Sequence, residues 1–94
     1  MQKLNSGEIA QTVEIIRKTY GNDDLKYDEN IGMYPGPCVF DKPKSGIPKT
    51  DVGENQVLIG FSDLPKTMAD SYLILFEKDD DVFVLKDEIA HWRG

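Results

Sequence analysis

Residues 71–86, SYLILFEKDDDVFVLK, constrain the fold of this chain most, because two apolar runs of strand length flank a short acidic segment. The first run is apolar at five consecutive positions: Tyr72, Leu73, Ile74, Leu75 and Phe76. Successive side chains of a strand point to opposite faces of a sheet, so both faces of this strand would be apolar. Such a pattern predicts a central strand that is covered on both sides.

The acidic segment, residues 77–81, joins the two apolar runs. It is short, charged and rich in aspartate, a residue that favours turns. The second run, VFVL at residues 82–85, follows it directly. This arrangement is typical of an antiparallel β-hairpin, and we expect residues 71–86 to form one.

Residues 4–20 carry the pattern of an amphipathic helix. Asn5 can cap the first turn, and Glu8, three residues later, can complete a capping box. The apolar residues that follow recur at spacings of four, three and four and form one stripe: Ile9, Val13, Ile16 and Tyr20. Gly21 can adopt the left-handed conformation that ends many helices. We expect this helix to pack its apolar stripe and to leave charged residues such as Arg17 on its outer face.

The middle of the chain is punctuated by glycine and proline. Residues 32–53 contain eight of them in 22 positions, and each proline removes a hydrogen-bond donor from a strand. Only short strands, such as residues 38–40, are therefore expected there. Residues 25–27 alternate in a way that can begin another short strand, and residues 56–61 form a longer apolar run that predicts a strand.

The last part of the chain, residues 86–92, suggests a different local structure. Ile89 and Trp92 stand three residues apart, and Asp87 lies near the start of the segment. This spacing predicts a single helical turn, with Trp92 lying against the sheet.

Together these elements predict an α+β fold in a single domain that spans residues 1–94. An N-terminal helix would pack on a twisted antiparallel sheet of four or five strands. A chain of 94 residues suffices for one modest hydrophobic core. The alternative is a small SH3-like β-barrel with an appended helix, because short strands, long early loops and a terminal helical turn also describe that architecture.

The charge of the chain is unevenly distributed. Residues 1–53 contain seven basic and eight acidic residues, whereas residues 54–94 contain four basic and nine acidic ones, and the net charge is -6. Direct binding to nucleic acid is disfavoured, because that affinity depends on clustered Lys and Arg. A protein partner with a basic surface is favoured instead.

The sequence also bears on cellular location. It has no apolar run of the roughly 20 residues that a membrane-spanning helix needs, so we expect no membrane association. Residues 1–5 lack the pattern of a secretory signal, and a single cysteine cannot form an internal disulfide. We therefore expect a cytoplasmic protein.

The strongest surface feature is a set of acidic residues in and after the acidic segment: Glu77, Asp79, Asp80, Asp81, Asp87 and Glu88. We interpret them as an acidic face that binds a protein with a basic surface. A solvated turn and a weak cation site are the other interpretations. Three consecutive aspartates lack the alternating ligands and the glycine of an EF-hand loop, so we expect no metal site and no cofactor.

Residues 32–53 offer an alternative protein-binding site. Tyr34 stands among prolines and glycines, and three lysines follow it: Lys42, Lys44 and Lys49. The segment does not match a phosphate-binding P-loop, because proline rather than glycine precedes Lys49. It could dock a partner, or it could cover a pocket for a small molecule.

The residues most often used in catalysis do not form a recognisable arrangement. Cys38 lies beside an apolar run without the pattern of a nucleophile elbow, and His91 is the only histidine. We therefore expect a small acidic, non-enzymatic binding protein, of the inhibitor or immunity type, that covers a basic site on another protein. The alternatives are a structural or adaptor subunit that docks through residues 32–53, and a small-ligand-binding domain.

Overall fold

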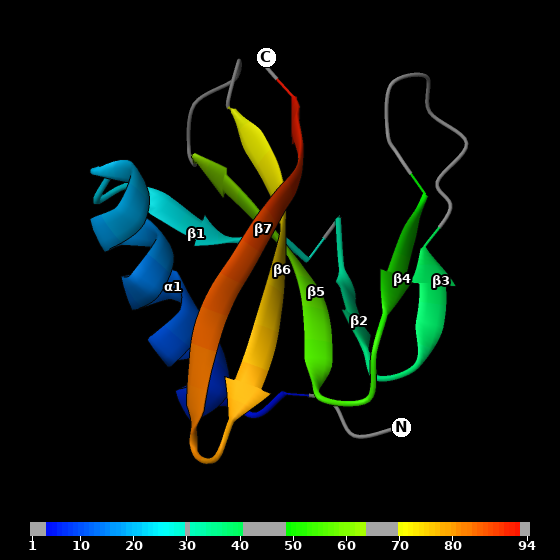
Figure 1. Ribbon diagram of the computed structural model, residues 1–94. Coiled ribbons are helices and arrows are strands. Elements are labelled where there is room, and N and C mark those ends of the chain that lie inside the picture. Colours follow the sequence, from blue (N-terminus) through cyan, green and yellow to red (C-terminus); the bar gives the residue numbers. More distant parts are fainter. Residues whose placement is uncertain (1–3, 30, 41–48, 64–69, 93–94) are drawn as a thin grey trace.

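The computed structural model describes residues 4–29, 31–40, 49–63 and 70–92, which Figure 1 traces in colour. Within these residues, one helix and seven strands follow one another along the chain: α1 (Ser6–Tyr20), β1 (Leu25–Tyr27), β2 (Met33–Pro35), β3 (Cys38–Phe40), β4 (Thr50–Val52), β5 (Gln56–Asp63), β6 (Ser71–Asp79) and β7 (Val82–Trp92). The N-terminal helix, the hairpin and the short strands of the Gly- and Pro-rich region are therefore confirmed.

Five of the strands form the main sheet, in which every pairing is antiparallel. Four of them stand in the order β1, β5, β6 and β7, and β2 pairs with another part of β5. Strands β3 and β4 pair with each other in a second, two-stranded sheet. The predicted α+β fold, with an N-terminal helix on an antiparallel sheet, is confirmed.

The strands do not close into a barrel. β1 and β2 lie at one edge of the main sheet and β7 lies at the other, and no pairing among the described residues joins the two edges. α1 packs against both β1 and β7, and so it covers the face that a barrel would enclose. The alternative of an SH3-like barrel is therefore wrong.

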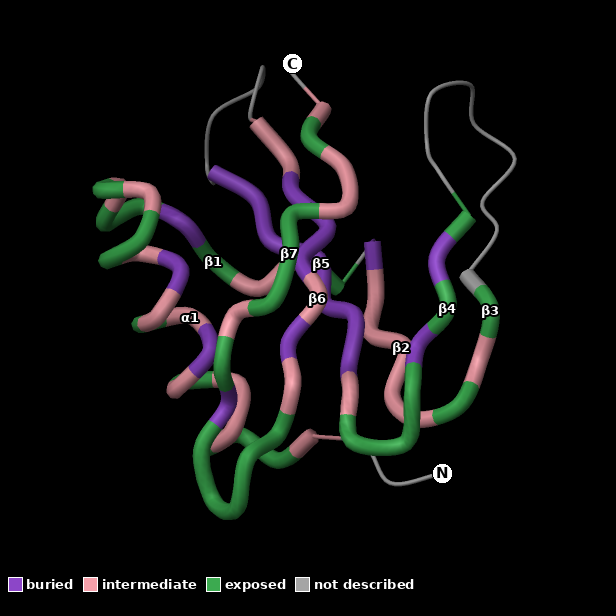
Figure 2. Tube along the Cα trace, in the orientation of Figure 1, coloured by how far each residue is buried: buried purple, intermediate pink, exposed green. Residues whose placement is uncertain are grey.

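β6 is the central strand that its apolar run predicts. It pairs with β5 on one side and with β7 on the other. Tyr72, Ile74 and Phe76 belong to one cluster of buried residues, whereas Leu73 belongs to a second cluster. In Figure 2 the buried positions concentrate along β5 and β6. The prediction of a strand covered on both faces is confirmed.

α1 begins and ends where its sequence predicts. The Glu8 amide donates a hydrogen bond to Asn5 Oδ1 over 2.9 Å, and the Asn5 amide donates one to Glu8 Oε1 over 3.0 Å, which completes the capping box. Gly21 follows the helix with φ 64°, the left-handed conformation that a glycine adopts without strain.

The apolar stripe of α1 packs on one face of the main sheet. Ile16 is fully buried in the cluster that contains Ile74 and Phe76. One turn further along the helix, the Tyr20 ring lies 5.0 Å from the Tyr72 ring, measured between centroids. The predicted packing of the stripe is therefore confirmed.

Polar side chains join α1 to both edge regions of the main sheet. Arg17, which was predicted on the outer face, is partly buried and donates a hydrogen bond from Nε to the Leu25 carbonyl over 3.0 Å. This position differs from the prediction because the end of α1 lies beside β1. On the opposite side, the Phe83 amide of β7 donates a hydrogen bond to Gln11 Oε1 over 3.0 Å.

The expected helical turn at residues 86–92 is wrong, because β7 continues as a strand to Trp92. The pairing with β6 shifts register twice, at Lys86 and at Ile89, where one residue of β7 has no direct partner. Each shift interrupts the alternation of side chains along the strand. The three-residue spacing of Ile89 and Trp92 resembles a helical pattern for that reason.

β1 and β2 both pair with the same edge of β5, one on each side of Gly60. Gly60 lies between the residues that pair with β1 and those that pair with β2. Its carbonyl accepts a hydrogen bond from the Asp28 amide over 2.9 Å, and its amide donates one to the Gly32 carbonyl over 3.0 Å. Ile31 occupies the space that a side chain at position 60 would need. Glycine is therefore required at this point of the strand.

Candidate functional site

The acidic turn of the hairpin is tighter than its sequence predicts. β6 continues through Asp79, so only Asp80 and Asp81 form the turn between β6 and β7. Asp80 has φ 54°, a conformation that aspartate tolerates better than most residues. All three aspartates are exposed. The two longest strands of the fold thus present these carboxylates at their shared end.

The structure separates Asp87 and Glu88 from this turn but keeps Glu77 beside it. Glu77 lies next to the turn, and its Oε2 is 3.7 Å from Lys86 Nζ in an ion pair. Asp87 and Glu88 lie six and seven residues beyond Asp81, which corresponds to about 20 Å of strand. The six predicted residues therefore belong to two regions of the hairpin.

Glu88 has a partner on the helix-bearing face of the sheet. It lies opposite Ile74 in the register of β6 and β7, and it accepts a hydrogen bond from the Tyr20 hydroxyl. Burial, this hydrogen bond and the charge of Glu88 together raise the pKa of Tyr20 to about 12. Glu88 therefore lies near the last turn of α1, away from the acidic turn.

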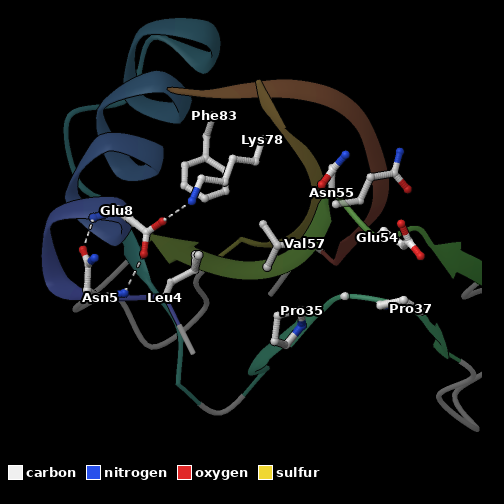
Figure 3. Close-up of a pocket in the computed structure, with 12 residues that line it drawn as sticks. Leu4, Asn5, Glu8, Pro35, Pro37, Glu54, Asn55, Val57, Lys78 and Phe83 are labelled. Atoms are coloured by element: carbon white, nitrogen blue, oxygen red, sulfur yellow. Dashed lines mark hydrogen bonds and ion pairs between the residues drawn. The ribbon is translucent and has the colours of Figure 1, made fainter. Parts of the chain in front are cut away.

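A groove of about 670 Å³ opens beside the acidic turn. Figure 3 shows that its lining comes from the first turn of α1, the link between β2 and β3, the turn between β4 and β5, and the hairpin of β6 and β7. Its apolar lining comprises Leu4, Pro35, Gly36, Pro37, Val57 and Phe83, and its polar lining comprises Asn5, Glu8, Glu54, Asn55, Gln56 and Lys78. The groove therefore combines apolar surface with charged groups.

Backbone hydrogen bonds fix the turn between β4 and β5 on the wall of the groove. The Lys78 amide donates to the Asn55 carbonyl over 2.7 Å, and the Gly36 amide donates to the Gln56 carbonyl over 3.1 Å. The Gln56 side chain also accepts a hydrogen bond from the Gly53 amide over 2.9 Å. These bonds connect three of the segments that line the groove.

A lysine side chain crosses the groove. Lys78 Nζ lies 3.5 Å from Glu8 Oε2 and 5.9 Å from the centroid of the Phe83 ring. Glu8 uses its other oxygen, Oε1, to accept the capping hydrogen bond from Asn5. A carboxylate and an aromatic ring thus hold one ammonium group between them, as Figure 3 shows.

The alternative site in residues 32–53 is described in part. Tyr34 is partly buried on β2, and its hydroxyl donates to the Ile31 carbonyl over 3.5 Å. Lys49 is exposed beside β4. Lys42 and Lys44 lie outside the described residues. Tyr34 therefore packs on the cluster that contains Ile31 and Leu58.

Cys38 and His91, the two residues considered for catalysis, lie on different strands, β3 and β7. Cys38 is partly buried and packs on the cluster that contains Val52 and Leu58. The His91 ring stacks on Tyr72 at 4.3 Å between centroids, and its Nε2 lies 3.5 Å from Asp70 Oδ2.

Two further features concern larger sets of residues. In the part of the chain that the structure describes, no three His, Cys, Asp or Glu side chains lie close enough together to hold a metal ion. No helix within the same residues is long and apolar enough to cross a membrane.

Comparisons of the chain with protein-family models, with curated proteins and with solved structures found no significant match.

The groove is a site that the sequence does not reveal. Leu4, Val57 and Phe83 follow the apolar patterns of core residues, and Glu8 follows the pattern of a helix cap. Only the packing of α1 on the main sheet brings Glu8 to Lys78, which is 70 residues away. The charge of the hairpin is the one signal that points to this end of the molecule.

Proposed function

We propose that this protein is a small acidic, non-enzymatic binding protein that covers a basic site on another protein, as an inhibitor or immunity-type antagonist does. One observation carries the proposal: Asp79, at the end of β6, and Asp80 and Asp81, in the turn that follows, are exposed together. Among the described residues, none of the three forms an ion pair. Their charges are therefore available to a partner.

The scaffold of the turn supports the same proposal. A two-residue turn between long paired strands restricts the carboxylates to a narrow range of positions, which lowers the entropy lost on binding. Glu54, on the adjacent turn between β4 and β5, is also exposed. The carboxylates of Glu54 and of the three aspartates lie at the same end of the molecule and repel one another in the free protein. A basic partner would relieve that repulsion.

The test is capture of a partner from a lysate of the source cells at low and high salt. The wild type is compared with Asp79→Asn/Asp80→Asn/Asp81→Asn. The matched control, Asp23→Asn/Asp24→Asn/Glu29→Gln, removes three exposed charges from other surface positions. We expect a basic partner to bind the wild type and the control at low salt, and to be lost from the first variant. Equal capture by all three proteins would contradict the proposal.

The groove favours a second candidate, the binding of a small molecule. Its volume of about 670 Å³ lies within the range of roughly 300–1,000 Å³ that is usual for ligand pockets. A ligand present at about a hundred times its dissociation constant would stabilise the protein by about 2.7 kcal/mol. A thermal-shift screen of metabolites measures this effect. Docking through residues 32–53 stays a prediction, because part of that segment lies outside the described residues.

A further inference from the structure

We infer that Glu8 and the ring of Phe83 form a binding site for an arginine side chain of the partner, and that Lys78 fills this site in the free protein. The inference rests on the proposed function, because it names the side chain of a basic partner that the groove receives. The occupant is an arginine in an extended segment that lies in the groove between α1 and the turn after β4.

The contacts of Lys78 show that the groove holds a cation. Its ammonium group lies 3.5 Å from Glu8 Oε2 and 5.9 Å from the Phe83 ring centroid. A carboxylate and the face of an aromatic ring are the two groups that attract a cationic side chain most directly. Both groups line the groove, but the Glu8 side chain is 25% exposed whereas Phe83 is only 5% exposed. An entering side chain therefore reaches the ring where Lys78 now lies over it.

Lys78 holds this position weakly. Its side chain is 49% exposed, and its nitrogen lies at the long end of ion-pair distances from Glu8. Exposed ion pairs contribute little to stability, because water and lost side-chain freedom offset most of the attraction. Lys78 can therefore swing into solvent and leave Glu8 and Phe83 to another cation. The backbone hydrogen bond between Lys78 and Asn55 does not depend on this movement.

The lining of the groove favours arginine over lysine as the entering side chain. A guanidinium group is planar and less strongly hydrated than an ammonium group, so it stacks on an aromatic ring at a lower desolvation cost. Leu4 and Pro35, which are both partly exposed, provide apolar surface for the methylene stem of the side chain. Glu54 and Asn55 offer further oxygens on the opposite wall. Figure 3 draws these residues among those that line the groove.

The test uses a capped pentapeptide with a central arginine between leucines, and its lysine and citrulline counterparts. Citrulline has the shape of arginine without its charge. Binding to the 15N-labelled protein is followed by NMR from the amide signals of Glu8, Asn55 and Phe83. We expect saturable shifts with the arginine peptide, weaker ones with lysine and none with citrulline.

Three variants assign the binding to the proposed groups. Lys78→Gln removes the internal competitor, and we expect it to tighten arginine binding about two- to fivefold, the factor that loss of an exposed ion pair implies. Lys86→Gln is the matched control, because it removes an equally exposed lysine from an ion pair with Glu77 outside the groove. Glu8→Gln keeps the capping box, which accepts glutamine, and should abolish the arginine preference.

Two results would overturn the inference. One is equal binding of the arginine and citrulline peptides, and the other is an equal effect of Lys78→Gln and Lys86→Gln. Partner capture separates this failure from failure of the proposed function. A basic partner that is lost with the Asp79, Asp80 and Asp81 variant, but binds Glu8→Gln unchanged, keeps the proposed function and rejects the arginine site. If the arginine peptide binds but no basic partner is captured, the arginine site is kept and the proposed function is rejected.

Discussion

The two faces of the main sheet are buried to different extents. On the helix-bearing face, eight buried residues of the sheet and Ile16 of α1 form one cluster, and aromatic rings such as Phe61 and Phe76 fill it. On the opposite face, the cluster of buried hydrophobic residues has four members, and the small sheet contributes Val52 to it. The apolar side chains around that second cluster, which include Leu75 and Trp92, are only partly buried.

The comparison teaches that one continuous helix buries a sheet more completely than a pair of three-residue strands. The helix-bearing face gains stability from the large area removed from water. On the opposite face, Ile31 packs closely against the backbone at Gly60. We therefore expect the two faces to respond differently to substitution.

The largest expected effect is on the helix-bearing face. Phe76→Ala removes a fully buried ring and should lower the free energy of unfolding by about 3–5 kcal/mol. Leu75→Ala, the neighbouring residue on the opposite face, should cost about 1–2 kcal/mol, because Leu75 is already partly exposed. Urea unfolding of both variants measures the difference. Equal losses would show that the two faces contribute equally at this strand.

The next effect tests the close contact of the opposite face. Gly60→Ala places a methyl group where Ile31 lies and should cost about 1–3 kcal/mol. Ile31→Ala in the same chain makes room for that methyl group. The double variant should therefore lose less stability than the sum of the two single variants, and a double-mutant cycle measures this coupling. Strict additivity would mean that the contact does not limit the packing.

The smallest expected effect concerns the pH dependence of the helix-bearing face. The pKa of Tyr20 is raised from 10 to about 12 in the folded protein, so folding favours the protonated hydroxyl. Its contribution to stability is complete below pH 10 and is lost as the pH rises from 10 to 12. Urea unfolding midpoints of the wild type should fall across this range more steeply than those of Tyr20→Phe. Parallel curves would show that the Tyr20 hydroxyl contributes nothing.

Local sequence predicts the parts of this fold that local contacts determine. Asn5, Glu8 and Gly21 fix the bounds of α1 through hydrogen bonds and a backbone conformation within a few residues. The two apolar runs around the acidic segment fix the hairpin in the same way. These features could be predicted because each depends on neighbours in the chain.

The end of β7 and the groove could not be predicted, for different physical reasons. In β7, the register shifts at Lys86 and Ile89 break the alternation that identifies a strand. In the groove, Glu8 lies near Lys78 and Phe83, which are 70 or more residues further along the chain. A pattern within one segment carries no information about such a combination.

The two register shifts of β7 also affect how readily the protein would aggregate in a crowded solution. Fibrils of the cross-β type grow when flat, regular strands stack in register, one chain on the next. β7 is the longest strand and lies at the border of its sheet, but its register shifts twice, and it carries three consecutive exposed charged residues, Lys86, Asp87 and Glu88. The irregularity that hides this strand in the sequence thus makes it a poor template for aggregation.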